Sequence, residues 1–237
     1  MDLPQPLREG RFIRRLNRFA VDVRIGRAIT RAHVPNSGRL GELLVEGAQL
    51  YLHPVAGRDR VTTHDLVLAR HGSVLVSLDS RAPAAIAAEA FVTGAVDPLP
   101  PAEQVRREVP FGDGRLDLCV RASGEEWLVE VKGCTLVRDG TAIFPDAPTR
   151  RGRRHVEELA AFAEKGGRAM VLFVVQRVDA RAFRPNVRTD PGFAEALQRA
   201  AGSGVLLRAY TCRVTTRQIA LDRRLPVSLG EADHPCA

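Results

Sequence analysis

Two short runs near the middle of the chain constrain its fold most strongly. In residues 115–120, apolar side chains alternate along an extended strand and leave Asp117 on the opposite face. In residues 127–132, apolar side chains alternate in the same way with Glu130 and Lys132. Because a period of two is typical of half-buried strands, the two runs predict a β-hairpin whose second face is polar.

The register of this hairpin is expected to bring two carboxylates together. A four-residue loop at 122–125 that pairs Arg121 with Glu126 places Asp117 directly opposite Glu130. Facing side chains lie about 5 Å apart, and two like charges at that distance cost stability unless a cation lies between them. Lys132 projects from the same face as Glu130, roughly 6.6 Å further along the strand.

The scarcity of lysine makes Lys132 informative. Lysine supplies only two of the 35 lysine and arginine residues. Arginine is a planar fork that stays charged, whereas lysine is a compact point charge whose pKa can move. A site that handles one water molecule or one phosphate oxygen can therefore require lysine specifically.

These three side chains predict a metal-dependent catalytic centre. Asp117 and Glu130 would hold Mg²⁺ or Mn²⁺, with water in the remaining positions. Lys132 would hold or deprotonate the attacking water. The alternative interpretation is a surface hairpin that carries an ordinary Glu130–Lys132 ion pair.

Long ordered motifs extend over nearly the whole chain. They are LNRFAVDV and HVPNSGRLGELL in the first half, and RREVPFGDGRLDL, EVKGCTL and FPDAPTRRGRRHVEEL in the second. A chain with these motifs resembles the sugar fermentation stimulation protein family (SfsA). The resemblance implies an OB-like barrel joined to a PD-(D/E)xK nuclease fold, non-specific DNA binding and a link to the regulation of sugar use, of the maltose type.

The resemblance also bears on the site residues. Asp117, Glu130 and Lys132 fall on positions that the nuclease fold uses for metal binding and catalysis. Glu89 falls on an early helix, from which nucleases of this fold often bring a further acid to the metal. The alternative is that Glu89 is an ordinary surface glutamate.

The expected fold class is α+β. Short strand candidates separated by Gly- and Pro-bearing turns predict a five-strand OB-like barrel in residues 1–82. Pro83 and the alanine-rich segment after it begin a restriction-endonuclease-like α/β domain with a mixed sheet, residues 83–229. The order expected there is helix, three-strand meander, helix, strand, helix, strand. Residues 230–237 are expected to form a frayed tail.

The basic charge predicts a polyanionic partner, DNA or RNA. The net charge is +7, and residues 11–31 contain seven arginines and a single acid. A helix capped by Thr149 and running to about Lys165 carries four arginines in its first turn, where the dipole disfavours cations and favours bound phosphate. The candidate nucleic-acid-binding residues are Arg14, Arg15, Arg18, Arg150, Arg151, Arg153, Arg154 and His155. Phe12, Phe19 and Tyr51 are the candidate stacking platforms.

Two alternatives stay open for these residues. The arginines of the barrel would equally suit a basic solvated sheet face, and His155 would equally suit a capped surface histidine. Gln176, which ends an apolar strand at 170–175, is expected at a strand edge where several folds place substrate contacts.

Composition narrows the class of protein. The sequence contains no run of about 18 apolar residues and no apolar signal core, so we expect a cytoplasmic protein without a membrane partner. The four cysteines lack C-x-x-C spacing and therefore indicate neither zinc nor a disulfide framework. An apolar content of 45% excludes a disordered chain.

Two functions remain open at this stage. One is a metal-dependent nuclease that cleaves phosphodiester bonds. The other is a catalytically silent DNA-binding regulator of sugar metabolism. A sugar-metabolic enzyme is disfavoured, because the sequence has no Gly-rich nucleotide loop and its positive charge suits phosphates better than neutral sugars.

Overall fold

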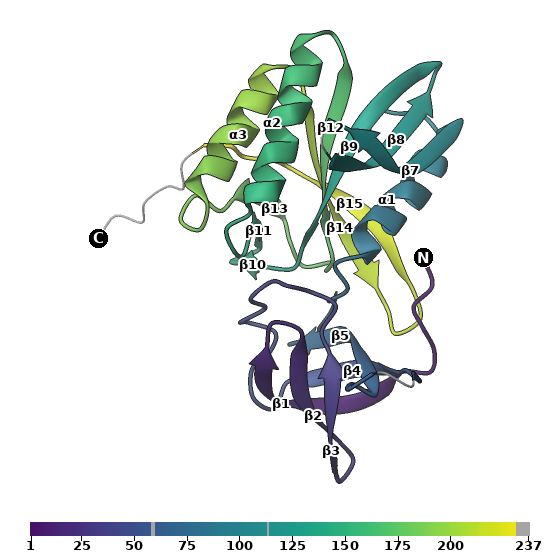
Figure 1. Ribbon diagram of the computed structural model, residues 1–237, viewed down its shortest axis with the longest axis vertical. Helices are drawn as coiled ribbons and strands as arrows, with labels where there is room; N and C mark the ends of the chain where they lie inside the picture. The colour runs from purple at the N-terminus through teal and green to yellow at the C-terminus, as the bar shows by residue number, and fades with distance from the viewer. Residues whose placement is uncertain (58–59, 113, 231–237) are drawn as a thin grey trace.

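The computed structural model describes residues 1–57, 60–112 and 114–230 and places a β-barrel against a larger α/β domain (Figure 1). The expected tail at 230–237 lies outside the described residues except for Gly230. Within the described residues, no helix is both long and apolar enough to cross a bilayer.

The barrel confirms the predicted OB-like architecture. Its strands are β1 Arg8–Asn17, β2 Ala20–Ile25, β3 Ala28–His33, β4 Gln49–Pro54, β5 His64–His71 and β6 Val74–Ser77. They pair in the order β3-β2-β1-β4-β5-β6, and a further pairing of β3 with β5 closes the first five strands. Inward-facing apolar residues such as Val21, Val23 and Leu50 fill the interior. Closure removes the exposed strand edges that would otherwise pair with other chains.

The second domain confirms the predicted mixed sheet. Its strands are β7 Gln104–Phe111, β8 Gly114–Ala122, β9 Glu125–Cys134, β12 Arg168–Val175, β14 Leu206–Val214 and β15 Ile219–Leu225, in the order β15-β14-β12-β9-β8-β7. Strands β7, β8 and β9 are antiparallel, whereas β12 is parallel to both β9 and β14. The chain enters this domain at α1, Ala82–Val92.

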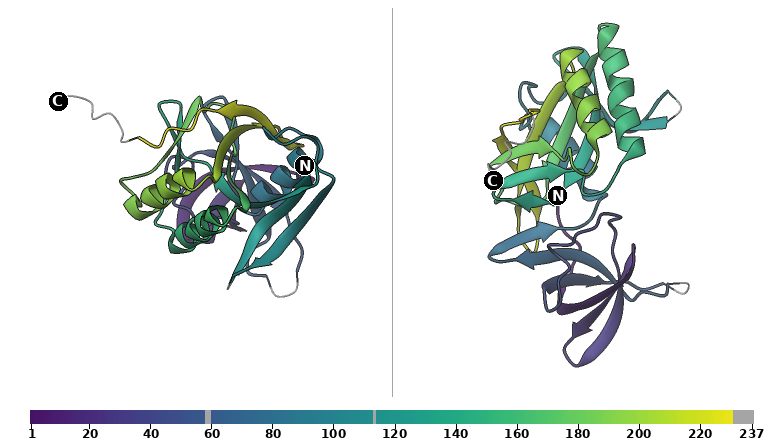
Figure 2. Two further views of the ribbon diagram at one scale, coloured as in Figure 1. Left: turned by 90° about the horizontal axis from the view of Figure 1, so that it is seen from above. Right: turned by 90° about the vertical axis from the view of Figure 1, so that its left-hand side faces the viewer.

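Helices cover both faces of this sheet. Helices α2, Arg150–Glu164, and α3, Pro191–Gly202, lie side by side on one face, and α1 lies on the other (Figures 1 and 2). Thr149 caps α2 as predicted, because its hydroxyl accepts the Gly152 N–H at 3.1 Å. The core on the α1 side also includes barrel residues such as Tyr51 and Leu68, so the two domains share apolar contacts.

Some short elements were not predicted from the sequence. Strands β10 Val137–Arg138, β11 Thr141–Phe144 and β13 Ala182–Pro185 form a separate small sheet, and β15 follows the strand that was expected to be last. Strands of two to four residues contain too few positions to show a period of two. Strands β10 and β11 lie between β9 and α2, and β13 pairs with β11 from beyond β12.

The central hairpin has the predicted register but a shorter loop. Leu118 pairs with Val129, and Arg121 pairs with Glu126, as expected. The expected four-residue loop is wrong, because Ala122 pairs with Glu125 and only Ser123 and Gly124 remain between the strands. Both have positive φ, 52° and 73°, as a two-residue hairpin turn of type I′ requires.

Candidate active site

A buried ion pair on β9 forms the centre of the site. Lys132 Nζ donates to Glu130 Oε1 at 2.5 Å, and the two side chains are only 13% and 4% exposed. The alternative of an ordinary surface pair is therefore wrong. A buried carboxylate and ammonium lose much hydration, so their positions must be fixed by further contacts.

His155 of α2 supplies one of these contacts. Its Nδ1 lies 2.7 Å from Glu130 Oε1, and the histidine is 3% exposed. This placement corrects both expectations for His155, a phosphate donor and a capped surface histidine, because the packing of α2 against β9 removes it from the surface. His155 instead orients the Glu130 carboxylate.

The second oxygen of Glu130 is left without a partner. Among the described residues, Oε2 is buried and accepts no hydrogen bond. A buried carboxylate oxygen without a partner costs about 1–3 kcal/mol or more. An oxygen in this state fits a cation ligand, because coordination would satisfy it.

Asp117 lies where the strand pattern breaks. The ladder between β7 and β8 pairs residues on either side of Asp117 but omits Asp117 itself, and its Oδ2 accepts the Val131 N–H at 2.7 Å. The predicted common face of Leu116 and Leu118 is consequently wrong, since Leu118 joins the core on the α1 side and Leu116 joins the core on the α2 side. The break turns the Asp117 carboxylate toward β9.

Burial and charge both perturb Asp117. Burial raises the pKa of its carboxyl to about 6, and the nearby Glu130 carboxylate contributes to this rise. The Val131 N–H and Lys132 oppose the rise in pKa without cancelling it. Asp117 and Glu130 are therefore close enough to repel each other. The pairing of β8 with β9 ends at Leu118 and Val129, however, so the expected direct pairing of Asp117 with Glu130 is not part of the ladder.

Sequence reasoning missed a third acid, Glu108. This exposed residue of β7 adds to the rise in the pKa of Asp117, which places its charge near the site. Its φ of 51° is rare for a residue other than glycine and marks an irregularity in β7 next to Asp117. No local motif signals it, because its position depends on pairing with β8.

Glu89 does not join the carboxylates of the hairpin. It is an exposed residue of α1, and its Oε2 accepts a hydrogen bond from the amine of Met1 at 2.6 Å. The expectation that Glu89 is a metal ligand is therefore corrected. Across the described ranges, no group of three His, Cys, Asp or Glu residues is arranged to hold a metal ion. An ion bound at the hairpin would find the carboxylates of Asp117 and Glu130 there, and water or substrate would have to complete its shell.

The arginines of α2 are exposed at its first turn, close to the buried site. Arg153 lies 4.0 Å from Glu157 and Arg154 lies 3.4 Å from Glu158, so both are partly neutralised. Arg150 and Arg151 make no ion pair with another described residue. Those two are therefore the most available for phosphate.

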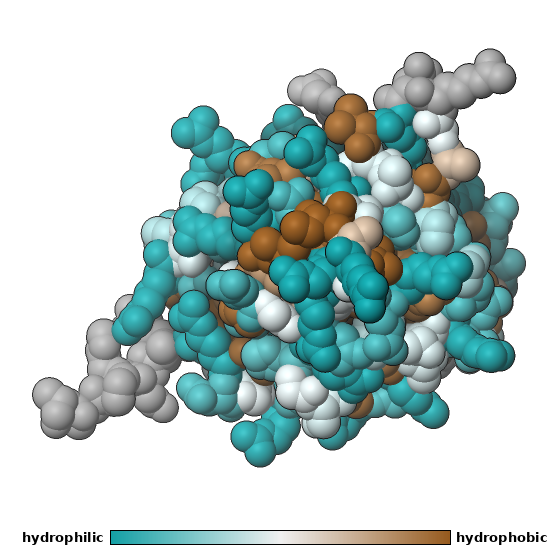
Figure 3. Space-filling view, turned by 90° about the horizontal axis from the view of Figure 1, so that it is seen from below, coloured by the Kyte–Doolittle hydropathy of each residue, from teal (hydrophilic) through white to brown (hydrophobic). Residues whose placement is uncertain are grey.

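The arginines of the barrel divide in a similar way. Arg14 pairs with Asp22 at 2.9 Å, and Arg15 donates to three backbone carbonyls, including that of Arg39. These bonds give Arg15 a structural role that the sequence did not reveal. Arg18 is exposed at the turn between β1 and β2. Figure 3, which views the molecule from below, shows a mostly hydrophilic surface at this end.

Only one of the three expected stacking platforms is accessible. Phe12 and Tyr51 are 6% and 4% exposed, because they fill the barrel interior and the contact between the domains. Phe19 is 48% exposed. The barrel therefore offers fewer stacking contacts than expected.

The fold and the site together define a class of protein. It consists of an OB barrel joined to a restriction-endonuclease-like domain, with two carboxylates and a lysine on adjacent strands. Residues 13–78 match the family model described as the SfsA N-terminal OB domain, and residues 81–218 match the model described as the sugar fermentation stimulation protein RE domain. The chain belongs to the sugar fermentation stimulation protein (SfsA) family.

Known relatives agree over almost the full length. A sugar fermentation stimulation protein homolog from Acetivibrio thermocellus is 44% identical and covers 96% of this chain and 99% of its own. A homolog from Caldanaerobacter subterraneus is 42% identical over 97% of this chain and 100% of its own. The structure of Pyrococcus furiosus SfsA in complex with Ca²⁺ superposes with a TM-score of 0.87, at 32% identity over 96% of this chain and 98% of that one.

Proposed function

We propose that this protein binds nucleic acid and cleaves its phosphodiester bonds with a divalent metal ion. The observation that carries the proposal is the state of Glu130. One of its oxygens is fixed by Lys132 and His155, and the other is buried without a partner beside a second carboxylate. Such an arrangement costs stability unless a cation completes it.

Asp117 and Glu130 are the residues that would hold the ion. Both supply oxygen, which Mg²⁺ and Mn²⁺ prefer, and Mg²⁺ is commonly held by one or two carboxylates together with waters and phosphate. The Ca²⁺ in the related Pyrococcus furiosus structure supports a divalent ion in this family. When bound, the ion would neutralise charge on the phosphoryl oxygens.

The other residues would position the reactants. Lys132 Nζ and His155 Nδ1 both contact Oε1 of Glu130. The ammonium can donate a further hydrogen bond to a water or to a phosphate oxygen. Arg150 and Arg151 at the start of α2 can neutralise the phosphates on either side, where the helix dipole also favours anions. His155 keeps the Glu130 carboxylate in one orientation.

A second candidate function is a DNA-binding regulator of sugar metabolism that has kept this fold without turnover. The observation that favours it is that, among the described residues, no group of three His, Cys, Asp or Glu side chains is arranged to hold a metal ion, and that Glu89 lies elsewhere. The net charge of +7 serves binding in both candidates.

Cleavage assays separate the two candidates. Labelled single- and double-stranded DNA and RNA are incubated with the wild-type protein in Mg²⁺, Mn²⁺ or EDTA, alongside Asp117→Asn and Lys132→Ala. We expect cleavage only with metal, and a loss of several orders of magnitude in both variants. Lys165→Ala is the matched control, since this exposed lysine ends α2 away from the site and its removal should leave the rate unchanged.

The outcomes are distinct. Tight binding without cleavage of any of the four substrates would reject the nuclease and leave the regulator. Equal cleavage by wild type and Lys132→Ala would reject the assigned role of Lys132.

A further inference from the structure

A cavity of about 230 Å³ lies where the two domains meet, next to the candidate active site. Its lining includes Asn36 and Gly38 of the barrel domain and Gly133, Asp146 and Gln176 of the α/β domain. Gly133 directly follows Lys132 on β9, and Gln176 directly follows the parallel strand β12. The cavity thus lies at the carboxyl ends of two neighbouring parallel strands, where ligands commonly bind in such sheets.

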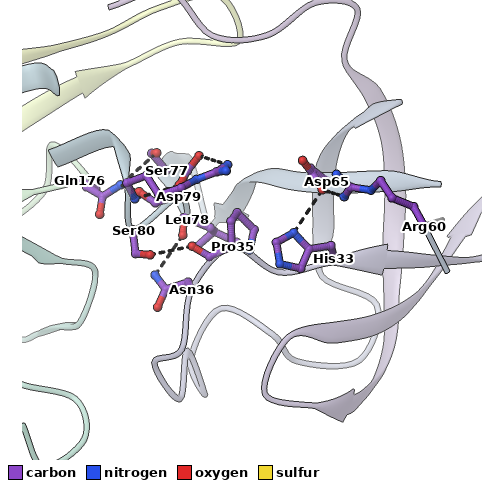
Figure 4. Close-up of polar contacts among 11 residues, drawn as sticks. His33, Pro35, Asn36, Arg60, Asp65, Ser77, Leu78, Asp79, Ser80 and Gln176 are labelled. Carbon is purple, nitrogen blue, oxygen red and sulfur yellow. Dashed lines mark hydrogen bonds and ion pairs between the residues drawn. The ribbon is translucent and has the colours of Figure 1, made fainter. Parts of the chain in front are cut away.

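Gln176 presents a fixed acceptor there. It is 1% exposed, and its Nε2 donates to Ser77 Oγ at 3.1 Å and to the Asp79 carbonyl at 3.0 Å (Figure 4). These two bonds settle the orientation of the amide, so Oε1 must face the other way. A Cβ atom placed on Gly133 would lie 2.9 Å from this oxygen. Glycine therefore leaves Oε1 accessible from the cavity, and Oε1 accepts no hydrogen bond from another described residue.

Asp146, which also lines the cavity, presents a second acceptor. Its Oδ2 accepts the Arg39 N–H at 2.8 Å, and a Cβ atom on Gly38 would lie 2.4 Å from the same oxygen. Asn36 holds this loop of the barrel domain in place by donating to the Leu78 carbonyl at 2.9 Å and accepting the Gly38 N–H at 2.8 Å. The hydrogen bond from Arg39 uses only Oδ2, so Oδ1 of Asp146 has no partner among the described residues.

The polar and apolar groups that line the cavity indicate the kind of ligand that it can bind. The acceptors without a donor among the described residues include the amide oxygen of Gln176 and one carboxylate oxygen of Asp146, the Ser37 hydroxyl lies beside them, and Phe144, Pro145 and Pro148 supply apolar surface. The Asp146 carboxylate repels phosphate, which favours a neutral group beside it over the sugar–phosphate backbone, while the start of α2 at Thr149 lies at the edge of the lining. A planar group with N–H donors suits both the apolar surface and the two acceptors.

We propose that this cavity binds an unpaired nucleobase that carries an amino group, next to the phosphate handled by Lys132. The inference rests on the proposed function, because it names the part of the substrate that the neighbouring site would cleave. A base within a duplex is stacked between its neighbours, so it cannot enter a cavity unless it is flipped out of the helix. The cavity therefore selects single strands, and it selects bases with an exocyclic amino group, such as adenine and cytosine, over thymine.

Binding to single strands tests this proposal. The affinities of fluorescein-labelled oligodeoxyadenylate, oligodeoxycytidylate and oligothymidylate are measured by anisotropy in Ca²⁺. We expect the wild-type protein to bind the first two about tenfold more tightly than oligothymidylate, within the range for a good pair of contacts to a base. Asp146→Asn keeps an oxygen for the Arg39 N–H but replaces a free acceptor with a donor, so it should abolish the preference.

Two further variants make the test specific. Asp139→Asn removes the same charge from an exposed turn whose φ of 50° asparagine tolerates, and it should keep the preference. Ala147→Leu adds bulk to the lining without removing a polar group, and it should also abolish the preference. Ala147→Leu therefore tests the base preference even when Asp146→Asn does not fold.

Equal affinity of the wild-type protein for all three strands would overturn the proposal, as would a preference that survives both Asp146→Asn and Ala147→Leu. Metal-dependent cleavage without base preference would reject the base cavity alone. Base preference without cleavage would reject the nuclease alone.

Discussion

Replacing Asp117 with asparagine should stabilise the metal-free protein at neutral pH. Burial and the Glu130 carboxylate raise the pKa of Asp117 from 3.8 to about 6, so its ionised form is disfavoured in the folded state. Asparagine removes this charge, and its side-chain oxygen can still accept the Val131 N–H. The variant therefore relieves a repulsion and keeps the hydrogen bond.

The magnitude follows from the pKa difference. The interval between 3.8 and about 6 corresponds to about 3 kcal/mol at 1.36 kcal/mol per pH unit. Asp117 is partly exposed, and solvent screening lowers this ceiling, so we expect a gain of about 1–3 kcal/mol at pH 7.

The sign of the pH dependence is fixed by proton binding. Between pH 3.8 and about 6 the folded state holds the proton of Asp117 while the unfolded state has released it, so the free energy of unfolding of the wild-type protein falls as pH rises through this window. The variant lacks this group. The difference in stability should therefore be small below pH 4, grow up to about pH 6 and then stay constant.

Urea unfolding in EDTA at pH 4, 5, 6, 7 and 8 measures this difference, and comparison of the two proteins cancels the titration of groups that do not interact with Asp117. A difference that does not change with pH would refute the reasoning. A variant that is less stable than the wild type at pH 7 would refute it as well.

Three further predictions concern single side chains or a single helix turn. Gly38→Ala should lower the free energy of unfolding by about 1–3 kcal/mol in urea, because its Cβ would lie 2.4 Å from a carboxylate oxygen of the facing loop; an unchanged midpoint would contradict it. His155→Ala should destabilise the metal-free protein by about 1–3 kcal/mol, because Glu130 is deprived of a buried partner, and calorimetry that shows no change would count against this role of His155. Exchanging both Arg150 and Arg151 for serine should flatten the salt dependence of DNA binding. The log–log slope should fall by about 0.7–0.9 for each phosphate that the protein no longer neutralises. An unchanged slope would exclude this turn as a DNA-binding surface.

Local features of the fold could be predicted from the sequence. The barrel strands, the hairpin register and the Thr149 cap each depend on residues a few positions apart. The two-residue turn escaped prediction, because its glycine at 124 stood inside a polar stretch that also suited a longer loop.

Features of the site that depend on packing between distant segments could not be predicted in the same way. His155 lies 25 residues from Glu130, and only the docking of α2 onto the sheet brings it there. Glu89 fits a common position for a metal ligand, yet it pairs with the amine of Met1 instead. The hydrogen bond between Asp146 and Arg39 spans 107 residues and forms only when both domains are assembled.

Manganese binding connects the hairpin carboxylates to metal chemistry without relying on activity. Electron paramagnetic resonance of free Mn²⁺ is recorded during titration with wild type, Asp117→Asn, Glu130→Gln and Lys132→Ala. We predict binding by wild type and Lys132→Ala, and loss of that binding in the two variants that remove a carboxylate. Mn²⁺ that stays free in the presence of the wild-type protein, or that binds Asp117→Asn with the same affinity, would contradict a metal centre on this hairpin.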